Sequence, residues 1–317
     1  MKTKNINSIF FSKLSLIFKI VLFMLILVVI VSAISFSIMA PISKDIRANI
    51  MEVGLGHKFF QYIEASLNGQ NIDAAREVLV DAFLKIDDIL ATWNGEVIGT
   101  VCVFIIFVIL YSMIYFMSYY TISDIIHNFM SSNSDYGFAA NFVANAKKSF
   151  LFALIYGLYT YAVYIIGFAI AIALGILVGK LNAILGLFTM YLLALGTLAL
   201  RRALAPFWMP AMISKELSVK DAFAKNMELI KNSFWRIFGE YVLIYLVSAV
   251  LFVITAVVTF GVGMIIVYAG VWLFMQIKDM VDYYHLNGMK YYIDEQTVIN
   301  PTKVYRDAVL DDENFSL

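Results

Sequence analysis

The chain contains 317 residues, of which 62% are apolar and 15% are charged, and its mean hydropathy is +0.83. Soluble domains are about 45–50% apolar and about 25% charged, so the composition excludes a water-soluble globular protein and predicts a multi-pass membrane protein. The formal net charge of zero gives no indication of a nucleic-acid partner. Because Cys102 is the only cysteine, an intrachain disulfide and a cysteine-based zinc or iron–sulfur site are excluded.

Charge-free apolar runs locate the membrane spans, since a helix needs about 20 apolar residues to cross a hydrocarbon core about 30 Å thick. The first run lies between Lys19 and Lys44 and is 24 residues long. A secretory signal peptide has an apolar region of only about 7–15 residues. We therefore expect a retained signal anchor at this end of the chain, with a cleaved signal peptide as the alternative.

The last apolar run, between Glu240 and Lys278, is 37 residues long. As one helix it would measure about 55 Å, which is too long for a single span even with ordinary tilt. The sequence Thr-Phe-Gly-Val-Gly at 259–263 offers a turn, so we expect two helices there and six spans in total. With the N-terminus inside, six spans place 17 Lys and Arg residues inside and 6 outside, whereas five spans place 13 inside and 10 outside. The positive-inside rule favours the six-span topology.

The predicted fold is therefore an all-α, six-span membrane protein with both termini in the cytoplasm, an extracytoplasmic helical hairpin and cytoplasmic interfacial helices. Its segments in chain order are the cytoplasmic N-terminus (1–15), the first span (16–40), the extracytoplasmic hairpin (41–96), the second span (97–121), a cytoplasmic loop with a surface helix (122–148), the third span (149–178), the fourth span (183–200), a cytoplasmic amphipathic segment (201–236), the fifth span (237–258), the sixth span (263–282) and the cytoplasmic tail (283–317).

Residues 41–96 are predicted to form two amphipathic helices, because their apolar residues recur three or four positions apart. Asn68-Gly69 marks the turn between the helices, and Asp73 is expected to cap the second helix. Gly54 and Gly56 are expected to interrupt the first helix, since each glycine costs roughly 1 kcal/mol there. The segment contains nine acidic and five basic residues, which form either a solvated surface or a sensor for a ligand or partner.

Two cytoplasmic segments, 138–148 and 218–234, are predicted to lie as amphipathic helices on the membrane surface. Ser218 and Asp221 resemble a helix-capping pair at the start of the second segment. Arginines at the ends of the spans anchor the topology, or they bind lipid headgroups because guanidinium groups pair with phosphate. The candidate contacts for lipid headgroups in these regions are Arg201, Arg202, Lys220, Lys225, Lys231 and Arg236.

Small residues recur every four positions in the third span, which allows close packing of helices. The seam consists of Gly167, Ala171, Gly175 and Gly179. It serves either packing within the chain or contact with a second copy. Tyrosines are frequent in the second and third spans, and those at membrane depth need hydrogen-bond partners or line a polar cavity.

The apolar runs contain no charged residue, which argues against a proton- or sodium-coupled transporter. No P-loop and no HExxH motif is present, so the sequence has no ATPase or zincin signature. Asp279, Asp282 and His285 recur three residues apart at the end of the last span. They are expected to be polar residues at the membrane interface, with a metal site as the alternative, and no cofactor is expected.

The region that follows the fourth span contains a recurring bacterial pattern. It comprises Pro-Phe-Trp-Met-Pro-Ala-Met at 206–212, Glu216, Ser218-x-x-Asp-Ala-Phe at 218–223 and Ser-Phe-Trp-Arg-Ile-Phe-Gly at 233–239. Over roughly residues 97–285 the chain resembles the membrane domain attached to some glycerophosphodiester phosphodiesterases and its stand-alone YciC-like relatives. The resemblance implies a six-helix inner-membrane protein of a family mostly of unknown function, and it carries over no catalytic residue because the soluble phosphodiesterase domain is absent. The segment 41–96 departs from that family.

A weak internal similarity links Phe-x-x-Asn at 142–145 and at 223–226, each followed by Ser-Phe and a span. It indicates either two related units or chance in a Phe-rich chain.

The sequence favours a non-enzymatic protein of the bacterial cytoplasmic (inner) membrane that organises the envelope or a membrane complex. One alternative is a transporter, a channel-like component or a lipid-handling protein that binds an anionic lipid at the cytoplasmic boundary. A second is a membrane sensor that uses residues 41–96. The expected partners are membrane lipids, with other membrane proteins or a second copy as further options, and nucleic acid is not among them.

Overall fold

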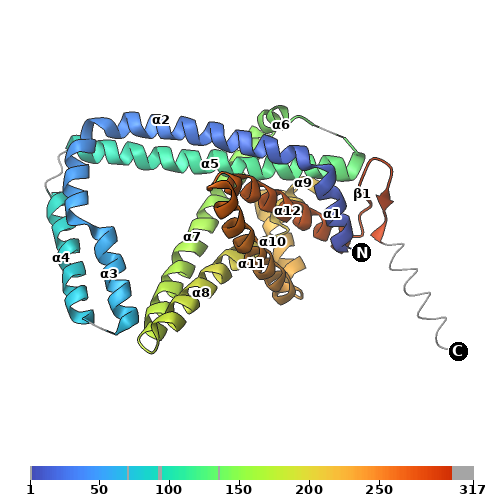
Figure 1. Ribbon diagram of the computed structural model, residues 1–317. Coiled ribbons are helices and arrows are strands. Elements are labelled where there is room, and N and C mark those ends of the chain that lie inside the picture. The colour runs from blue at the N-terminus through green and yellow to red at the C-terminus, as the bar shows by residue number, and fades with distance from the viewer. Residues whose placement is uncertain (1, 70, 92–94, 135, 302–317) are drawn as a thin grey trace. The chain divides into compact units, whose positions relative to one another are not determined.

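The computed structural model describes residues 2–69, 71–91, 95–134 and 136–301, and this part of the chain is all-α apart from one short two-stranded ladder (Figure 1). Within it, six helical segments are long and apolar enough to cross a membrane. They are Leu14–Ile38, Val97–Ser132, Ala146–Gly179, Ile184–Ser214, Phe234–Val258 and Gly263–Leu286. The prediction of six long apolar helices is therefore confirmed. The predicted tail extends to residue 317, and its part from 302 onward lies outside the described residues.

The helices and strands follow one another with short connections. In chain order they are α1 (Lys2–Ser12), α2 (Leu14–Val53), α3 (Leu55–Asn68), α4 (Ile72–Ala91), α5 (Gly95–Ser132), α6 (Phe138–Ala144), α7 (Ala146–Gly179), α8 (Ala183–Ala203), α9 (Trp208–Ser214), α10 (Val219–Ile230), α11 (Phe234–Thr259), α12 (Gly263–Leu286), β1 (Tyr291–Tyr292) and β2 (Val298–Ile299).

The chain divides into two compact units. The first comprises Met1–Leu25, Met113–Leu158 and Ala199–Leu317, and the second comprises Ile26–Ser112 and Tyr159–Leu198. The first unit therefore contains α1, α6, α9 to α12 and the strand pair, together with one end each of α2, α5, α7 and α8. The second unit contains α3, α4 and the other ends of those four helices.

Three predicted turns are present, and each uses a left-handed backbone conformation. Gly54 (φ 59°) separates α2 from α3, and Gly69 (φ 68°) ends α3. Gly261 (φ 90°) lies between α11 and α12, where Phe260 also has a positive φ of 51°. Glycine tolerates this conformation because it has no Cβ. These three glycines therefore lie at the points where α2, α3 and α11 end.

The structure adds detail to the predicted segments and corrects two details. The segment 1–15, predicted only as a cytoplasmic N-terminus, contains a separate helix, α1, and the backbone turns at Lys13 before α2 begins. Residues 122–132 belong to α5 rather than to a loop, and α5 continues because its polar residues find partners: the Asp124 carboxylate accepts a 3.0 Å hydrogen bond from Asn145 Nδ2. Asp73 lies in the first turn of α4, which begins at Ile72, rather than before it.

The interior of the first unit is rich in aromatic residues. α11 and α12 form an antiparallel hairpin, and α1 packs on α12 (Figure 1). Trp272 of α12 lies between Tyr115 and Tyr119 of α5, with ring centroids 5.5 and 4.6 Å away. Phe23 of α2 contacts the rings of Phe138 and Phe142, so the apolar face of α6 packs against this unit.

α10 packs part of its apolar face against α9, and the predicted position of this segment on the membrane surface stays a prediction. The indole of Trp208 lies 4.7 Å from the ring of Phe223 and donates a 2.8 Å hydrogen bond to the carbonyl of Val219. The buried side chain of Asn226 accepts from the backbone N–H of Phe207 (2.9 Å) and donates to the carbonyl of Leu204 (2.8 Å). The predicted capping by Ser218 is confirmed, since its Oγ accepts from the backbone N–H of Asp221 at 3.2 Å.

In the second unit, α3 and α4 lie side by side as a hairpin (Figure 1). α7 and α8 approach closely at the small residues of α7. A Cβ added at Gly167 would lie 2.3 Å from the Thr197 side chain, and one at Gly175 would lie 2.8 Å from that of Met190. Ala171 and Gly179 are buried on the same helix. The structure thus places the small-residue seam against α8 of the same chain.

We expect Gly167→Val to lower the free energy of unfolding by about 1–3 kcal/mol, because the larger side chain forces α7 away from Thr197. Gly196→Ala on α8 is the matched control, since nothing lies within 4 Å of a Cβ at that position. Thermal unfolding of the purified protein in detergent measures both variants. Equal melting temperatures for Gly167→Val and the unmodified protein would contradict this packing.

Candidate functional site

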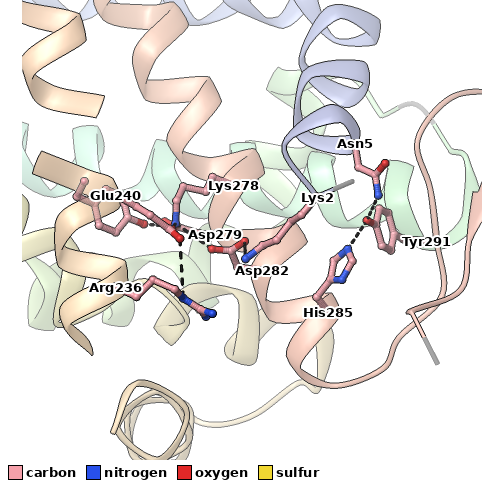
Figure 2. Close-up of polar contacts among 10 residues, drawn as sticks. Lys2, Asn5, Arg236, Glu240, Lys278, Asp279, Asp282, His285 and Tyr291 are labelled. Atoms are coloured by element: carbon pink, nitrogen blue, oxygen red, sulfur yellow. Dashed lines mark hydrogen bonds and ion pairs between the residues drawn. The ribbon is translucent and has the colours of Figure 1, made fainter. Parts of the chain in front are cut away.

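The most unusual feature of the first unit is a chain of charged side chains of alternating sign (Figure 2). Lys2 pairs with Asp282, whose Oδ2 lies 2.8 Å from Nζ of Lys278. Lys278 Nζ also lies 2.7 Å from Glu240 Oε2, and Glu240 Oε1 lies 3.9 Å from Nε of Arg236. We call these five residues the ion chain; it links α1, α12 and α11 and has a cation at each end.

A second ion pair lies beside the ion chain. Arg202 Nη2 is 2.9 Å from Asp279 Oδ2, and only 3% and 4% of the two side chains are exposed. The Tyr241 hydroxyl donates a hydrogen bond to the other carboxylate oxygen of Asp279. The Arg202 guanidinium carbon also lies 5.9 Å from the centre of the Tyr119 ring, within the range of a cation–π interaction. This pair joins α8 to α12 and brings α11 and α5 against them.

The local sequence explains why these groups meet. Lys278 and Asp282 are four residues apart on α12, so they share one face of the helix. Arg202 is in the last turn of α8, where the helix dipole favours a cation. Charged side chains within membrane-spanning helices are costly unless they pair with one another. Their pairing therefore constrains how α8, α11 and α12 can pack.

A hydrogen-bonded clamp holds the N-terminal helix and the strand pair. The Tyr291 hydroxyl accepts from Asn5 Nδ2 at 2.8 Å and is 2.7 Å from His285 Nε2. The amide nitrogen of Asn5 donates to the hydroxyl, whereas the direction of the hydrogen bond between the hydroxyl and His285 Nε2 depends on the tautomer of the imidazole. Burial raises the pKa of Tyr291 to about 12. In the adjoining turn, backbone N–H groups of Gln296 and Thr297 donate to Asp294 and lower the pKa of its carboxyl group.

The structure does not bring Asp279, Asp282 and His285 together as a cluster. Asp279 faces Arg202, Asp282 faces Lys278, and His285 faces Tyr291. Among the described residues, no group of three or more His, Cys, Asp or Glu side chains is arranged to hold a metal ion. Both aspartates are buried inside the helix packing, and their expected position at the membrane interface stays a prediction.

The six candidate lipid contacts fall into two groups. Arg201 and Arg202 are buried, and the Arg201 guanidinium lies 5.7 Å from the centre of the Tyr156 ring. The other four are on α10 or next to it: Lys220 and Lys231 are exposed, Lys225 pairs with Glu228 at 2.8 Å, and the side chain of Arg236 is 62% exposed. Of the six candidates, Arg201 and Arg202 are therefore buried inside the protein, whereas the other four are on its surface.

Sequence reasoning missed the ion chain for an identifiable reason. The spans were located as runs without charge, so Lys278, Asp279 and Asp282 were treated as the end of a span, whereas α12 continues as an apolar helix to Leu286. The four-residue spacing of Lys278 and Asp282 was a usable signal. Arg202 and Asp279 are 77 positions apart in the sequence, and no local pattern links them.

Several tyrosines of the long apolar helices have hydroxyl partners. Tyr115 is hydrogen-bonded to Tyr268 and lies 3.4 Å from the Tyr119 hydroxyl, and Tyr161 donates to Ser112 Oγ at 2.5 Å. These bonds satisfy polar groups that would otherwise be costly in a lipid environment.

The chain matches no protein-family model, no curated protein sequence and no solved structure. The ion chain, the Arg202–Asp279 pair and the Tyr291 clamp all join helices of the first unit to one another.

We expect Arg202→Met to destabilise the protein by about 3–5 kcal/mol, because it leaves the Asp279 carboxylate buried without its cation. The double variant Arg202→Met/Asp279→Leu should recover most of this loss, since it removes both charges. Lys231→Gln, at an exposed cation, should change stability by no more than about 0.5 kcal/mol. Unfolding in detergent measures all three; a double variant less stable than Arg202→Met would contradict the pairing.

Proposed function

We propose that this chain is a non-enzymatic, multi-pass membrane protein that organises a membrane or envelope complex, and that the α3–α4 hairpin is its protein-binding element. One observation carries the proposal. The hairpin lies outside the six apolar helical segments and yet exposes large apolar side chains. Phe60 of α3 is 70% exposed and Leu84 of α4 is 60% exposed, with Val78 and Val80 also exposed on α4.

Contact with a protein would stabilise these side chains. Burying one large apolar side chain is worth about 1.5–3 kcal/mol relative to leaving it in water. On α4, Val80 and Leu84 line a depression together with three acidic residues and one basic residue, so apolar and mainly acidic groups share one surface; the charged residues are Asp73, Glu77, Asp81 and Arg76. A docking surface of this kind fits a protein with an apolar patch bordered by basic residues.

The charge of the whole segment supports a protein partner over a lipid surface. Residues 41–96 contain nine acidic and five basic residues. An excess of negative charge is repelled by anionic lipid headgroups and attracted to a basic protein surface. The side chains of Asp87 and Asp88, two of these acids, lie outside the described residues.

We further propose a bacterial inner-membrane location, with both termini in the cytoplasm and the hairpin on the opposite face. The asymmetry of Lys and Arg between loops supports this orientation. The resemblance to the YciC-like family stays a prediction, and it supports only the six-helix architecture.

Labelling with a membrane-impermeant maleimide tests the orientation in intact spheroplasts. In a Cys102→Ser background, we expect Phe60→Cys to react from outside and Lys220→Cys to react only after permeabilisation, because the proposed topology puts the two positions on opposite faces of the membrane. Both residues are exposed in the structure, so neither is protected by packing. Reaction of Lys220→Cys in intact spheroplasts, without reaction of Phe60→Cys, would show the reverse orientation.

Site-specific photocrosslinking in living cells tests the hairpin as a protein-binding element. A benzophenone amino acid at Leu84 should give a discrete protein adduct whose mass is not that of a dimer, whereas the same group at Ile109, an exposed residue of α5, should not. Reversing the charge of the surface with Asp73→Lys/Glu77→Lys should reduce the adduct at least fivefold, because it removes the attraction to a basic partner. Glu228→Lys on α10 is the matched control and should leave the adduct unchanged. Adducts with lipid alone, dimer-sized adducts alone or equal adducts at Leu84 and Ile109 would each contradict the proposal.

A further inference from the structure

An apolar groove of about 450 Å³ lies along the α11–α12 hairpin of the first unit. Its walls include Leu243, Val247 and Leu251 of α11 and Gly270 and Phe274 of α12, and Phe10 of α1 forms its rim. The ring centroids of Phe10 and Phe274 are 5.9 Å apart. The volume is within the range of about 300–1,000 Å³ typical of small-molecule sites.

The groove leads directly to the ion chain. On α11, Glu240 and Arg236 continue the stripe of Leu243, Val247 and Leu251 toward the start of the helix, since residues three or four apart share a face. On α12, Lys278 lies one turn beyond Phe274. The 2.7 Å contact between Lys278 Nζ and Glu240 Oε2 bridges the two walls at this end. The site therefore has an apolar body and one charged end.

The charged end has an excess of positive charge. The ion chain contains the cations Lys2, Lys278 and Arg236 and the anions Asp282 and Glu240. Arg236 ends the chain on α11, where its side chain is 62% exposed and its contact with Glu240 is long, at 3.9 Å. A guanidinium group with exposed N–H donors can hold a phosphate through two parallel hydrogen bonds.

We propose that the groove holds one acyl chain of an anionic glycerophospholipid, with the lipid phosphate against Arg236. The dimensions fit this occupant. From Glu240 to Leu251, α11 rises about 16 Å, which is close to half of a hydrocarbon core about 30 Å thick. An acyl chain of one leaflet therefore matches the length of the groove.

A transmembrane helix of a partner or of a second copy fits less well. A helix is about 10–12 Å across with its side chains, so a 16 Å length of it occupies more than about 1,000 Å³. Such a helix would lie on the groove rather than fill it, and an apolar helix would leave the positive end without an anion. The lipid site is independent of the hairpin proposal, because it uses no residue of α3 or α4.

Photolabelling of the full-length protein in nanodiscs tests the site. The probes are phosphatidylglycerol and phosphatidylethanolamine, each with a diazirine on one acyl chain, and mass spectrometry maps the adducts. We expect the phosphatidylglycerol probe to label 243–251 and 267–274 more than it labels lipid-exposed residues of α5. Val247→Trp fills the groove and should reduce this labelling at least fivefold. Val253→Trp, an exposed valine on the opposite side of α11, should change it less than twofold.

The headgroup is tested with Arg236→Gln, which should reduce the preference for phosphatidylglycerol over phosphatidylethanolamine at least threefold. Lys147→Gln, at an exposed cation on α7, should leave the preference unchanged. If Val247→Trp does not give a monodisperse protein, Leu251→Trp provides a second way to fill the groove. Equal effects of Val247→Trp and Val253→Trp, equal labelling by both probes in the unmodified protein, or protein–protein adducts from the groove in place of lipid adducts would overturn the proposal.

Discussion

The packing of the first unit depends on the pairing of charges that lie inside membrane-spanning helices. Lys278, Asp279 and Asp282 occupy one turn of α12, and Arg202 ends the apolar part of α8. A single unpaired charge buried between these helices would be costly, whereas oppositely charged groups at 2.7–2.9 Å offset much of that cost. Each ion pair specifies which two helices are neighbours and their relative position along the helix axes. Apolar packing alone does not specify this.

The apolar spans and their turns could be predicted because they depend on local properties. Run length gives the six helices, and glycine at 54, 69 and 261 gives the turns. Ser218 as a cap also follows from residues three positions apart. In each case the deciding interaction is within a few residues along the chain, so the sequence pattern and the structure agree.

The remaining features depend on partners far apart in the sequence. α10 has the amphipathic pattern of a membrane-surface helix, and α9 covers part of its apolar face; the composition of a helix does not reveal which apolar surface it meets. From the sequence, Arg202 was predicted to anchor the topology or to bind a lipid headgroup, because it is one of two arginines at the end of a span. Its partner Asp279 lies on another helix, so only the three-dimensional structure shows that the arginine is buried and neutralised.

The Tyr291 clamp also has a consequence for biosynthesis. Asn5 and Tyr291 are separated by 286 positions, and α1 packs on α12. Because a protein chain is synthesised from its N-terminal side, α1 is made before α12 and β1. The native contacts of α1 with α12 and with Tyr291 can therefore form only after residue 291 has been made. A chain truncated before that residue would lack the hydrogen bond between Asn5 and Tyr291 that holds α1.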